Sequence, residues 1–148
     1  MIKKIEKPKI IEAAGNKPKR IEEFIGCINS QTSEISMARM KSPAGWEEPG
    51  QRPQFDEYTL VLKGMLRVKT TNSVVDVESG QAIIVSANEW VQYSTPNYEG
   101  AEYIAVCLPA FTPDKVNRDE EKAQTHALQG ETRDALYIFK FGIGYENL

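Results

Sequence analysis

An acidic residue at the start of an apolar stretch is the strongest candidate for chemistry in this sequence. Residues 55–68 read FDEYTLVLKGMLRV, in which Glu57 opens an apolar run that Gly64 interrupts. A carboxylate that faces a pocket loses solvent, and burial raises its pKa towards the range useful for acid–base chemistry. Glu57 is therefore a candidate general acid, general base or hydrogen-bond acceptor. The alternative is a structural ion pair with Arg39 or Lys63.

Several polar and aromatic side chains could share a pocket with Glu57. Residues 42–54 contain three prolines and two glycines, which predicts an ordered loop rather than a strand. A loop of this composition beside the Glu57 strand is suited to form a pocket rim. Arg39 could bind a ligand carboxylate in a fork or could neutralise Glu57, and Trp46 could wall the cavity or fill the core. The candidate ligand-binding residues are Gln51, Arg39, Trp46 and Gln54.

The donor atoms near Glu57 argue against a transition-metal site. Zinc, copper and iron favour imidazole or thiolate donors, whereas Gln51, Gln54 and Asp56 offer only oxygen and amide groups. The single histidine, His126, lies far along the chain. We therefore expect neither a metal ion nor another cofactor. The sequence also contains no GxxxxGK[ST] and no GxSxG motif, which argues against common nucleotide and serine hydrolysis.

Composition indicates a soluble globular protein. The chain has 148 residues and a net charge of −3, which argues against nucleic acid or an anionic membrane as the main partner. No apolar run approaches the roughly 20 residues needed to span a bilayer. The N-terminus lacks the features of a signal peptide, and Cys27 and Cys107 form no disulfide framework, so we expect a cytoplasmic protein.

The pattern of short apolar runs predicts an all-β fold, because turn signals recur about every ten residues. The segment 55–68 reads as two strands joined at Lys63 and Gly64, with Glu57 in phase with Thr59 and Val61. In the run 35–40, Ile35, Met37 and Arg39 fall on one side and the intervening residues on the other. Further strands are expected at 21–30, 73–77, 81–85, 90–95, 102–108 and 136–141.

Two segments outside these strands leave alternatives open. The cluster Lys17, Lys19 and Arg20 could hold a phosphate group, or could be a solvated basic loop. Residues 113–132 are polar and lack clear periodicity, so a short helix at 119–128 and a mobile connection are both compatible with them.

The arrangement of strands and turns resembles the cupin family. Cupins carry a first block with two histidines, a glutamate, six residues and a glycine, which Glu57 to Gly64 matches at its end. The second block opens with a glycine and five residues, as found from Gly80 to Ser86. Within the family the chain is most similar to EutQ-type cupins of ethanolamine utilisation. Gly50 and Arg52 (or Gln51 and Pro53) stand where the first histidines belong, and Val91 stands at the second-block histidine.

The resemblance implies an all-β fold, a single RmlC-like jelly-roll barrel, with a short irregular or helical C-terminal segment. We expect N-terminal strands in 1–34, the barrel core in 35–112 and an appendage in 113–148. Tyr93 shares a strand phase with Val91, so its hydroxyl could reach the cavity and act with Glu57 in catalysis. The expected function is small-molecule binding without a metal; the alternative is a lyase or isomerase that uses Glu57. We also expect a homodimer.

Overall fold

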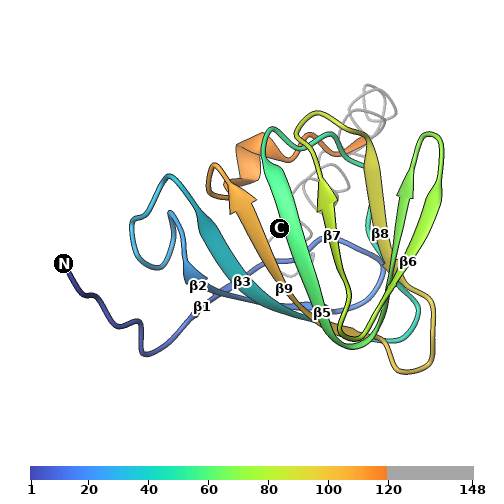
Figure 1. The fold of residues 1–148 in the computed structure, drawn as a ribbon, viewed down its shortest axis with the longest axis horizontal. Coiled ribbons are helices and arrows are strands. Elements are labelled where there is room, and N and C mark those ends of the chain that lie inside the picture. The colour runs from blue at the N-terminus through green and yellow to red at the C-terminus, as the bar shows by residue number, and fades with distance from the viewer. Residues whose placement is uncertain (120–148) are drawn as a thin grey trace, which may run out of the picture.

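The computed structural model describes residues 1–119, and their regular secondary structure is almost entirely β (Figure 1). The predicted all-β class is confirmed. The described residues also contain a short 3-10 turn, η1 (Pro113–Lys115). Three sequence-based expectations fall outside the described residues. They are the strand at 136–141, His126, and the helix at 119–128 apart from its first residue, Asp119. The strands are β1 (Lys9–Ile11), β2 (Arg20–Ile25), β3 (Ser36–Ser42), β4 (Trp46–Glu47), β5 (Asp56–Thr70), β6 (Val74–Glu78), β7 (Ala82–Val85), β8 (Val91–Thr95) and β9 (Ala101–Leu108).

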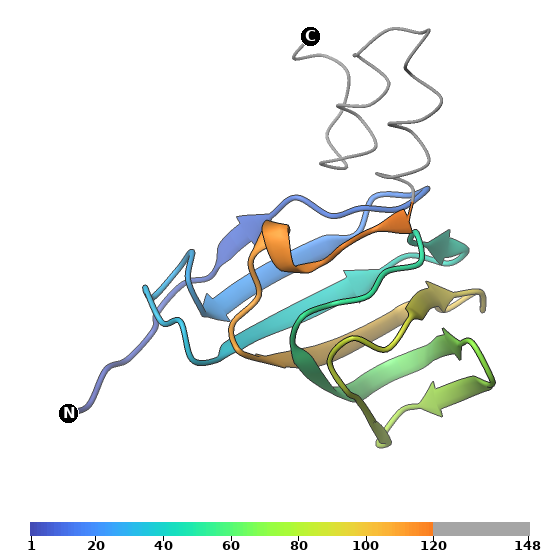
Figure 2. The same cartoon turned by 90° about the horizontal axis from the view of Figure 1, so that it is seen from above.

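The strands pair in the order β1-β2-β3-β9-β5-β8-β4, with β6 and β7 also paired to β5. All of these pairings are antiparallel. The paired strands curl around a common interior, as the two perpendicular views show (Figure 1, Figure 2). In the described part of the chain, no helix is long and apolar enough to cross a membrane.

Strand β5 holds the two parts of the sheet together. Its first half pairs with β9 and β7, and its second half pairs with β8 and β6. The predicted turn at Lys63 and Gly64 is wrong, because β5 is one continuous strand of 15 residues. The register with β9 shifts between Val61 and Lys63, which is a β-bulge. Gly64 has φ of 73°, a left-handed value that glycine adopts without strain.

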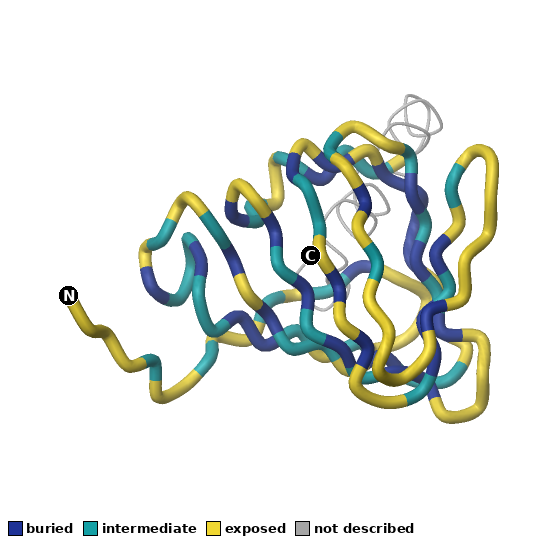
Figure 3. Tube along the Cα trace, viewed as in Figure 1, coloured by how far each residue is buried: buried dark blue, intermediate teal, exposed yellow. Residues whose placement is uncertain are grey.

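The bulge also reverses which residues of β5 face the interior. Thr59 and Val61 are buried before it, as their alternation predicts, whereas Lys63 is exposed. After the bulge, Leu66 and Val68 are fully buried and join the core. Figure 3 shows the resulting alternation of buried and exposed positions along the strands. The core consists of Trp46, Val61, Leu66, Val68, Val77, Val85, Val91, Tyr93, Ala101 and Tyr103.

At the N-terminal end, the predicted strand at 21–30 is shorter than expected. Strand β2 ends at Ile25, and Gly26 follows with φ of 155°. The buried Glu23 carboxylate accepts hydrogen bonds from the backbone N–H groups of Ile28 and Asn29, both at 3.0 Å. Since these amides are satisfied by a side chain, the chain turns here instead of continuing the ladder.

Candidate functional site

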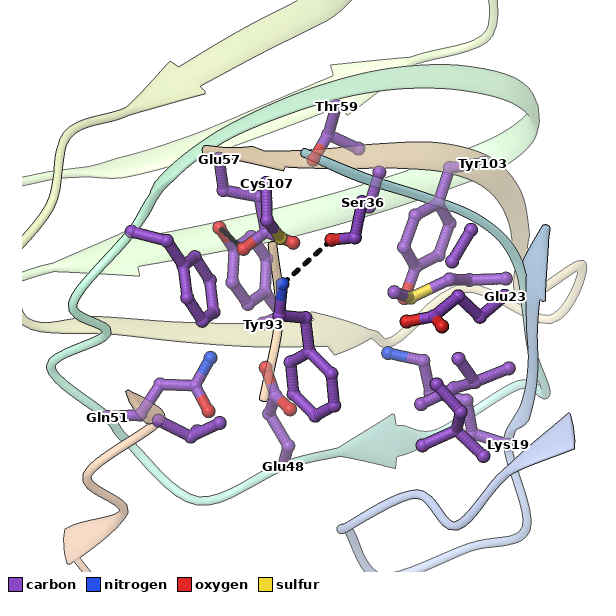
Figure 4. A pocket seen from close by; sticks show the side chains of 18 of the residues that line it. Lys19, Glu23, Ser36, Glu48, Gln51, Glu57, Thr59, Tyr93, Tyr103 and Cys107 are labelled. Carbon is purple, nitrogen blue, oxygen red and sulfur yellow. Dashed lines mark hydrogen bonds between the residues drawn. The ribbon is translucent and has the colours of Figure 1, made fainter. Parts of the chain in front are cut away.

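The curled sheet encloses a cavity of about 70 Å³. Its lining combines apolar side chains, among them Ala38, Met40, Phe55, Ala105 and Phe111, with polar and charged groups (Figure 4). The polar groups that concern function are Lys19, Glu48, Gln51, Glu57, Tyr93 and Tyr103. A mostly apolar concavity with a few convergent polar groups is typical of a small-molecule site.

Strands and two connecting segments position these polar groups, with Lys19 in the connection between β1 and β2. Glu57 lies on β5, Tyr93 on β8 and Tyr103 on β9, so neighbouring strands present them to the same interior. Glu48 and Gln51 lie on the loop between β4 and β5. This loop is held in place because Gln51 and Val91 exchange two backbone hydrogen bonds of 2.9 Å, and the N–H of Glu48 donates to the Tyr93 carbonyl at 3.2 Å.

Glu57 and Tyr93 form a hydrogen-bonded pair in the cavity. The Tyr93 hydroxyl donates to Oε1 of Glu57 at 3.0 Å. Burial raises the pKa of Glu57 from 4.5 to about 7, and the nearby charge of Glu48 adds to this rise. The hydrogen bond from Tyr93 and the charge of Lys19 act in the opposite direction. The Glu57 carboxyl group can therefore both donate and accept a proton near neutral pH.

Glu48 is a second buried carboxyl group in the same cavity, with 8% of its surface exposed. Burial raises the pKa of Glu48, and the charges of Lys19 and Arg118 partly offset the rise. Two carboxyl groups that share a low-dielectric cavity disfavour simultaneous ionisation. At neutral pH, Glu48 and Glu57 are therefore not both fully ionised.

Lys19 places a positive charge on the cavity wall opposite Gln51 and Glu57 (Figure 4). Its Nζ lies 4.2 Å from the ring centroid of Trp46 and 5.3 Å from that of Tyr103, which are cation–π distances. Desolvation lowers the pKa of the Lys19 ammonium, but Tyr103, Glu48 and Glu57 reverse this effect and leave the pKa raised. Lys19 is therefore protonated at neutral pH.

Gln51 carries a buried acceptor that the described protein does not satisfy. The residue is 5% exposed, and its Oε1 has no hydrogen-bond partner among residues 1–119. The side chain points into the cavity from the wall opposite Lys19 (Figure 4). Buried polar groups are almost always hydrogen-bonded, so an orphan of this kind calls for an explanation.

The structure places three of the six predicted site residues in this cavity and three outside it. Glu57, Tyr93 and Gln51 line the cavity. Trp46 is fully buried beneath the Lys19 ammonium, and its indole N–H donates to the Ala14 carbonyl at 3.1 Å, so Trp46 belongs to the core. Gln54 is exposed.

Arg39 lies on the outer side of β3, paired with a glutamate other than Glu57. Its Nε donates to Glu22 at 2.7 Å, in a register where these two residues of β3 and β2 are opposite each other. The Nζ atom of Lys63 lies 4.0 Å from Oε2 of Glu102, so these two residues form an ion pair. The suggested ion pairs of Glu57 with Arg39 or Lys63 are therefore wrong, because both cations have other partners.

Sequence reasoning missed Lys19, Glu48 and Tyr103 as members of the site. Lys19 did stand out as part of a basic cluster, and Glu48 stood in the loop expected to form a pocket rim. No local pattern distinguishes these two residues from the exposed Lys17 and Glu47 nearby. Only strand pairing brings them to one interior.

The residues of the cavity do not fit a transition metal. In the described part of the chain, no three His, Cys, Asp or Glu side chains are grouped so that they could hold a metal ion. Of the four ligands that the cupin resemblance implies, Glu57 alone is present at its position. Burial raises the pKa of the Cys107 thiol far above its ordinary value, and the neutral thiol is a poor ligand. No metal-dependent step is derived for this chain.

Comparison with known sequences finds one curated relative. No protein-family model matches the chain. The relative, endoribonuclease YbeY of Myxococcus xanthus (strain DK1622), is 38% identical over 104 residues, which is 70% of this chain. The match covers 35% of that protein, so the chain spans about a third of its length. A match of this extent does not carry the activity of the whole protein to this chain.

Comparison with solved structures finds cupin-type proteins. RemF, a polyketide cyclase from Streptomyces resistomycificus, has a TM-score of 0.65 at 15% identity, over 80% of this chain and 86% of RemF. Oxalate decarboxylase from Bacillus subtilis has a TM-score of 0.68 at 15% identity, over 97% of this chain and 36% of that chain. EutQ from Salmonella typhimurium LT2 has a TM-score of 0.51 at 17% identity, over 63% of this chain and 71% of EutQ. Identities this low show the fold alone. The chain is a cupin-fold protein, as its sequence resemblance indicates.

Proposed function

We propose that the cavity of this cupin-fold protein binds a small organic molecule without the help of a metal ion. The observation that carries the proposal is the orphan acceptor Oε1 of Gln51, buried in the cavity wall. A buried acceptor without a partner costs about 1–3 kcal/mol. A ligand that donates a hydrogen bond to Gln51 would remove this cost on binding.

The surroundings of Gln51 support a ligand rather than a bulk-water channel. Phe55 and Phe111 pack edge to face, with ring centroids 6.2 Å apart, and together with Met40 they give the cavity apolar walls. These walls suit the carbon skeleton of an organic compound. The cavity is smaller than the roughly 300–1,000 Å³ of a drug-sized site. The ligand is therefore a compound of few non-hydrogen atoms.

Native mass spectrometry of the freshly purified protein, followed by small-molecule mass spectrometry of the released fraction, tests this proposal. We expect a bound organic compound in the unmodified protein and a reduced bound fraction in Gln51→Leu. Gln54→Leu is the matched control, because Gln54 is exposed three residues away, and it should retain the compound. Equal retention by both variants would contradict the role of Gln51. Absence of any retained compound, together with no binding from a metabolite extract, would overturn the proposed function.

A second candidate function is proton-transfer catalysis of the lyase or isomerase type. Two features favour it: the pKa of Glu57 stands near 7, and the group next to it is a tyrosine hydroxyl rather than an arginine. In this reading, Glu57 takes or gives a proton at a carbon atom of the ligand while Tyr93 orients the carboxylate.

Deuterium exchange separates catalysis from simple binding. Incubation of the released compound with the protein in D₂O should place deuterium at a C–H position if Glu57 removes that proton. Glu57→Gln should abolish the exchange, because an amide is not a base, while the compound still binds. Exchange at the same rate in both proteins, or none in either, would leave the cavity as a binding site and exclude this candidate.

A further inference from the structure

We propose that the ligand of the cavity is a small carboxylic acid that also carries a hydroxyl or amino group. Its carboxylate lies at Lys19 and its donor group at Gln51. This inference rests on the proposed function, since it names the chemical class of the molecule bound there. The Lys19 end of the cavity supports the carboxylate, and the Gln51 end separately supports the donor group.

The Lys19 end is suited to an anion. In residues 1–119, no carboxylate forms an ion pair with the Lys19 ammonium, which packs against the rings of Trp46 and Tyr103 and shares a hydrogen bond with the Tyr103 side chain. Aromatic faces stabilise a cation but accept no conventional hydrogen bond from it. The ammonium is protonated at neutral pH, as described above. The ammonium has three N–H donors and Tyr103 takes one of them, so a carboxylate that enters the cavity would meet a desolvated positive charge that can still donate hydrogen bonds.

The opposite end is rich in acceptors. Gln51 presents its unpartnered Oε1, and Glu57 uses Oε1 for the Tyr93 hydroxyl, which leaves Oε2 with no hydrogen bond in the described structure. Figure 4 shows Gln51 and Glu57 on the wall away from Lys19. The unpartnered oxygen of Gln51 calls for a ligand group that donates a hydrogen bond, which a hydroxyl or an amino group does and a second carboxylate does not.

The apolar part of the lining leaves room for a short carbon chain. Met40 and Ala105 line the cavity, as do Phe55 and Phe111, whose rings pack edge to face. A cavity of about 70 Å³ limits the spacer to a few carbon atoms. The chemistry at the ends therefore distinguishes a hydroxy acid or an amino acid from a longer or an uncharged compound.

Isothermal titration calorimetry with matched probes tests the inference on the full-length protein. The probes are 3-hydroxypropanoate, β-alanine, propanoate and 3-hydroxypropanamide, which share the same short skeleton. We expect 3-hydroxypropanoate or β-alanine to bind about tenfold or more tightly than propanoate, which lacks the donor. The same probe should also bind more tightly than 3-hydroxypropanamide, which lacks the negative charge. The comparison between 3-hydroxypropanoate and β-alanine identifies the donor as hydroxyl or ammonium.

Two variants assign the preferences to the two ends of the cavity. Lys19→Met should remove the preference for the acid over the amide and leave the preference for the donor. Gln51→Leu should do the reverse, and Lys69→Met on the exposed side of β5 should change neither. The probe comparison in the unmodified protein needs no variant, so it remains decisive if Lys19→Met fails to fold.

The outcomes separate this inference from the proposed function. The inference is overturned if the amide binds as tightly as the acid, if propanoate binds as tightly as the bifunctional probes, or if no probe binds. In each of these cases a different compound retained by the purified protein would still uphold small-molecule binding at Gln51.

Discussion

Replacement of Glu57 by Gln tests the electrostatics of the cavity most directly. The pKa of Glu57 rises on folding from 4.5 to about 7, with burial as the largest cause. Below the lower value the group is neutral in both the folded and the unfolded state, so it has no effect on stability. Above the higher value the folded protein holds a buried carboxylate that the unfolded chain would solvate. Stability is therefore lost as the pH rises from 4.5 to about 7.

The size of the effect follows from the shift. A rise of this size corresponds to about 3 kcal/mol at alkaline pH, and this is an upper value because the half-buried side chain keeps some contact with solvent. Glu57→Gln preserves the shape and the acceptor for Tyr93 but cannot ionise. The variant should therefore match the unmodified protein near pH 4 and exceed its free energy of unfolding by about 2–3 kcal/mol near pH 8.5.

Urea denaturation at the two pH values, followed by tryptophan fluorescence, measures this difference. Glu89→Gln is the control, because Glu89 is an exposed glutamate whose replacement should have the same small effect at both pH values. A stability difference for Glu57→Gln that does not change with pH would refute the reasoning, since it would mean that Glu57 does not titrate in this window. An unfolded variant would assign Glu57 a structural role instead of a place in a functional cavity.

Tyr93→Phe should raise the pKa of Glu57 above about 7, because the hydrogen bond from Tyr93 lowers that pKa. A ¹³C NMR titration of the Glu57 carboxyl group measures the change, and an unchanged or lower midpoint would contradict the prediction. Gly64→Ala should cost about 3 kcal/mol in thermal or urea unfolding, since φ is left-handed and the new Cβ collides with the Gly100 carbonyl oxygen. Gly80→Ala, also left-handed but with open space around it, should cost only about 1 kcal/mol, and equal losses would show that the collision is relieved. The purified protein should hold less than about one equivalent of any transition metal, which elemental analysis would contradict by finding stoichiometric zinc, iron, nickel or manganese. The chain should form a homodimer, because the sequence of residues 1–30 and 136–148 contains more apolar residues than one small barrel is expected to cover, and light scattering would reject this with a mass near 16.6 kDa.

Local patterns in the sequence were sufficient for the strands and for the fold class. In β3, the alternation that separates Met37 and Arg39 from Ser36 and Ala38 reappears as outward-facing and cavity-facing positions. The expected strands near β6, β7, β8 and β9 lie within about one residue of their observed bounds. Side-chain direction alternates strictly along a strand, so a short run of residues already contains this information.

Alternation alone does not indicate which face is buried or which residue lies opposite. Arg39 was a candidate partner of Glu57, but the pairing of β2 with β3 places it beside Glu22 on the outer face. The sequence predicted a turn at Lys63 and Gly64, where the structure has a register shift within the continuous strand β5. The pairing of β5 with β9 on both sides of the shift makes it a bulge.

The cavity itself depends entirely on tertiary structure. Lys19, Glu48 and Glu57 come from three separate segments, and no local pattern in the sequence indicates that they share one cavity. Their pKa shifts arise because the curled sheet removes them from water and brings them near one another. Amino-acid sequence by itself determined that Glu57 opens a strand of an all-β protein. Strand register and burial decided which charges share its interior, because desolvation and proximity are properties of the folded chain.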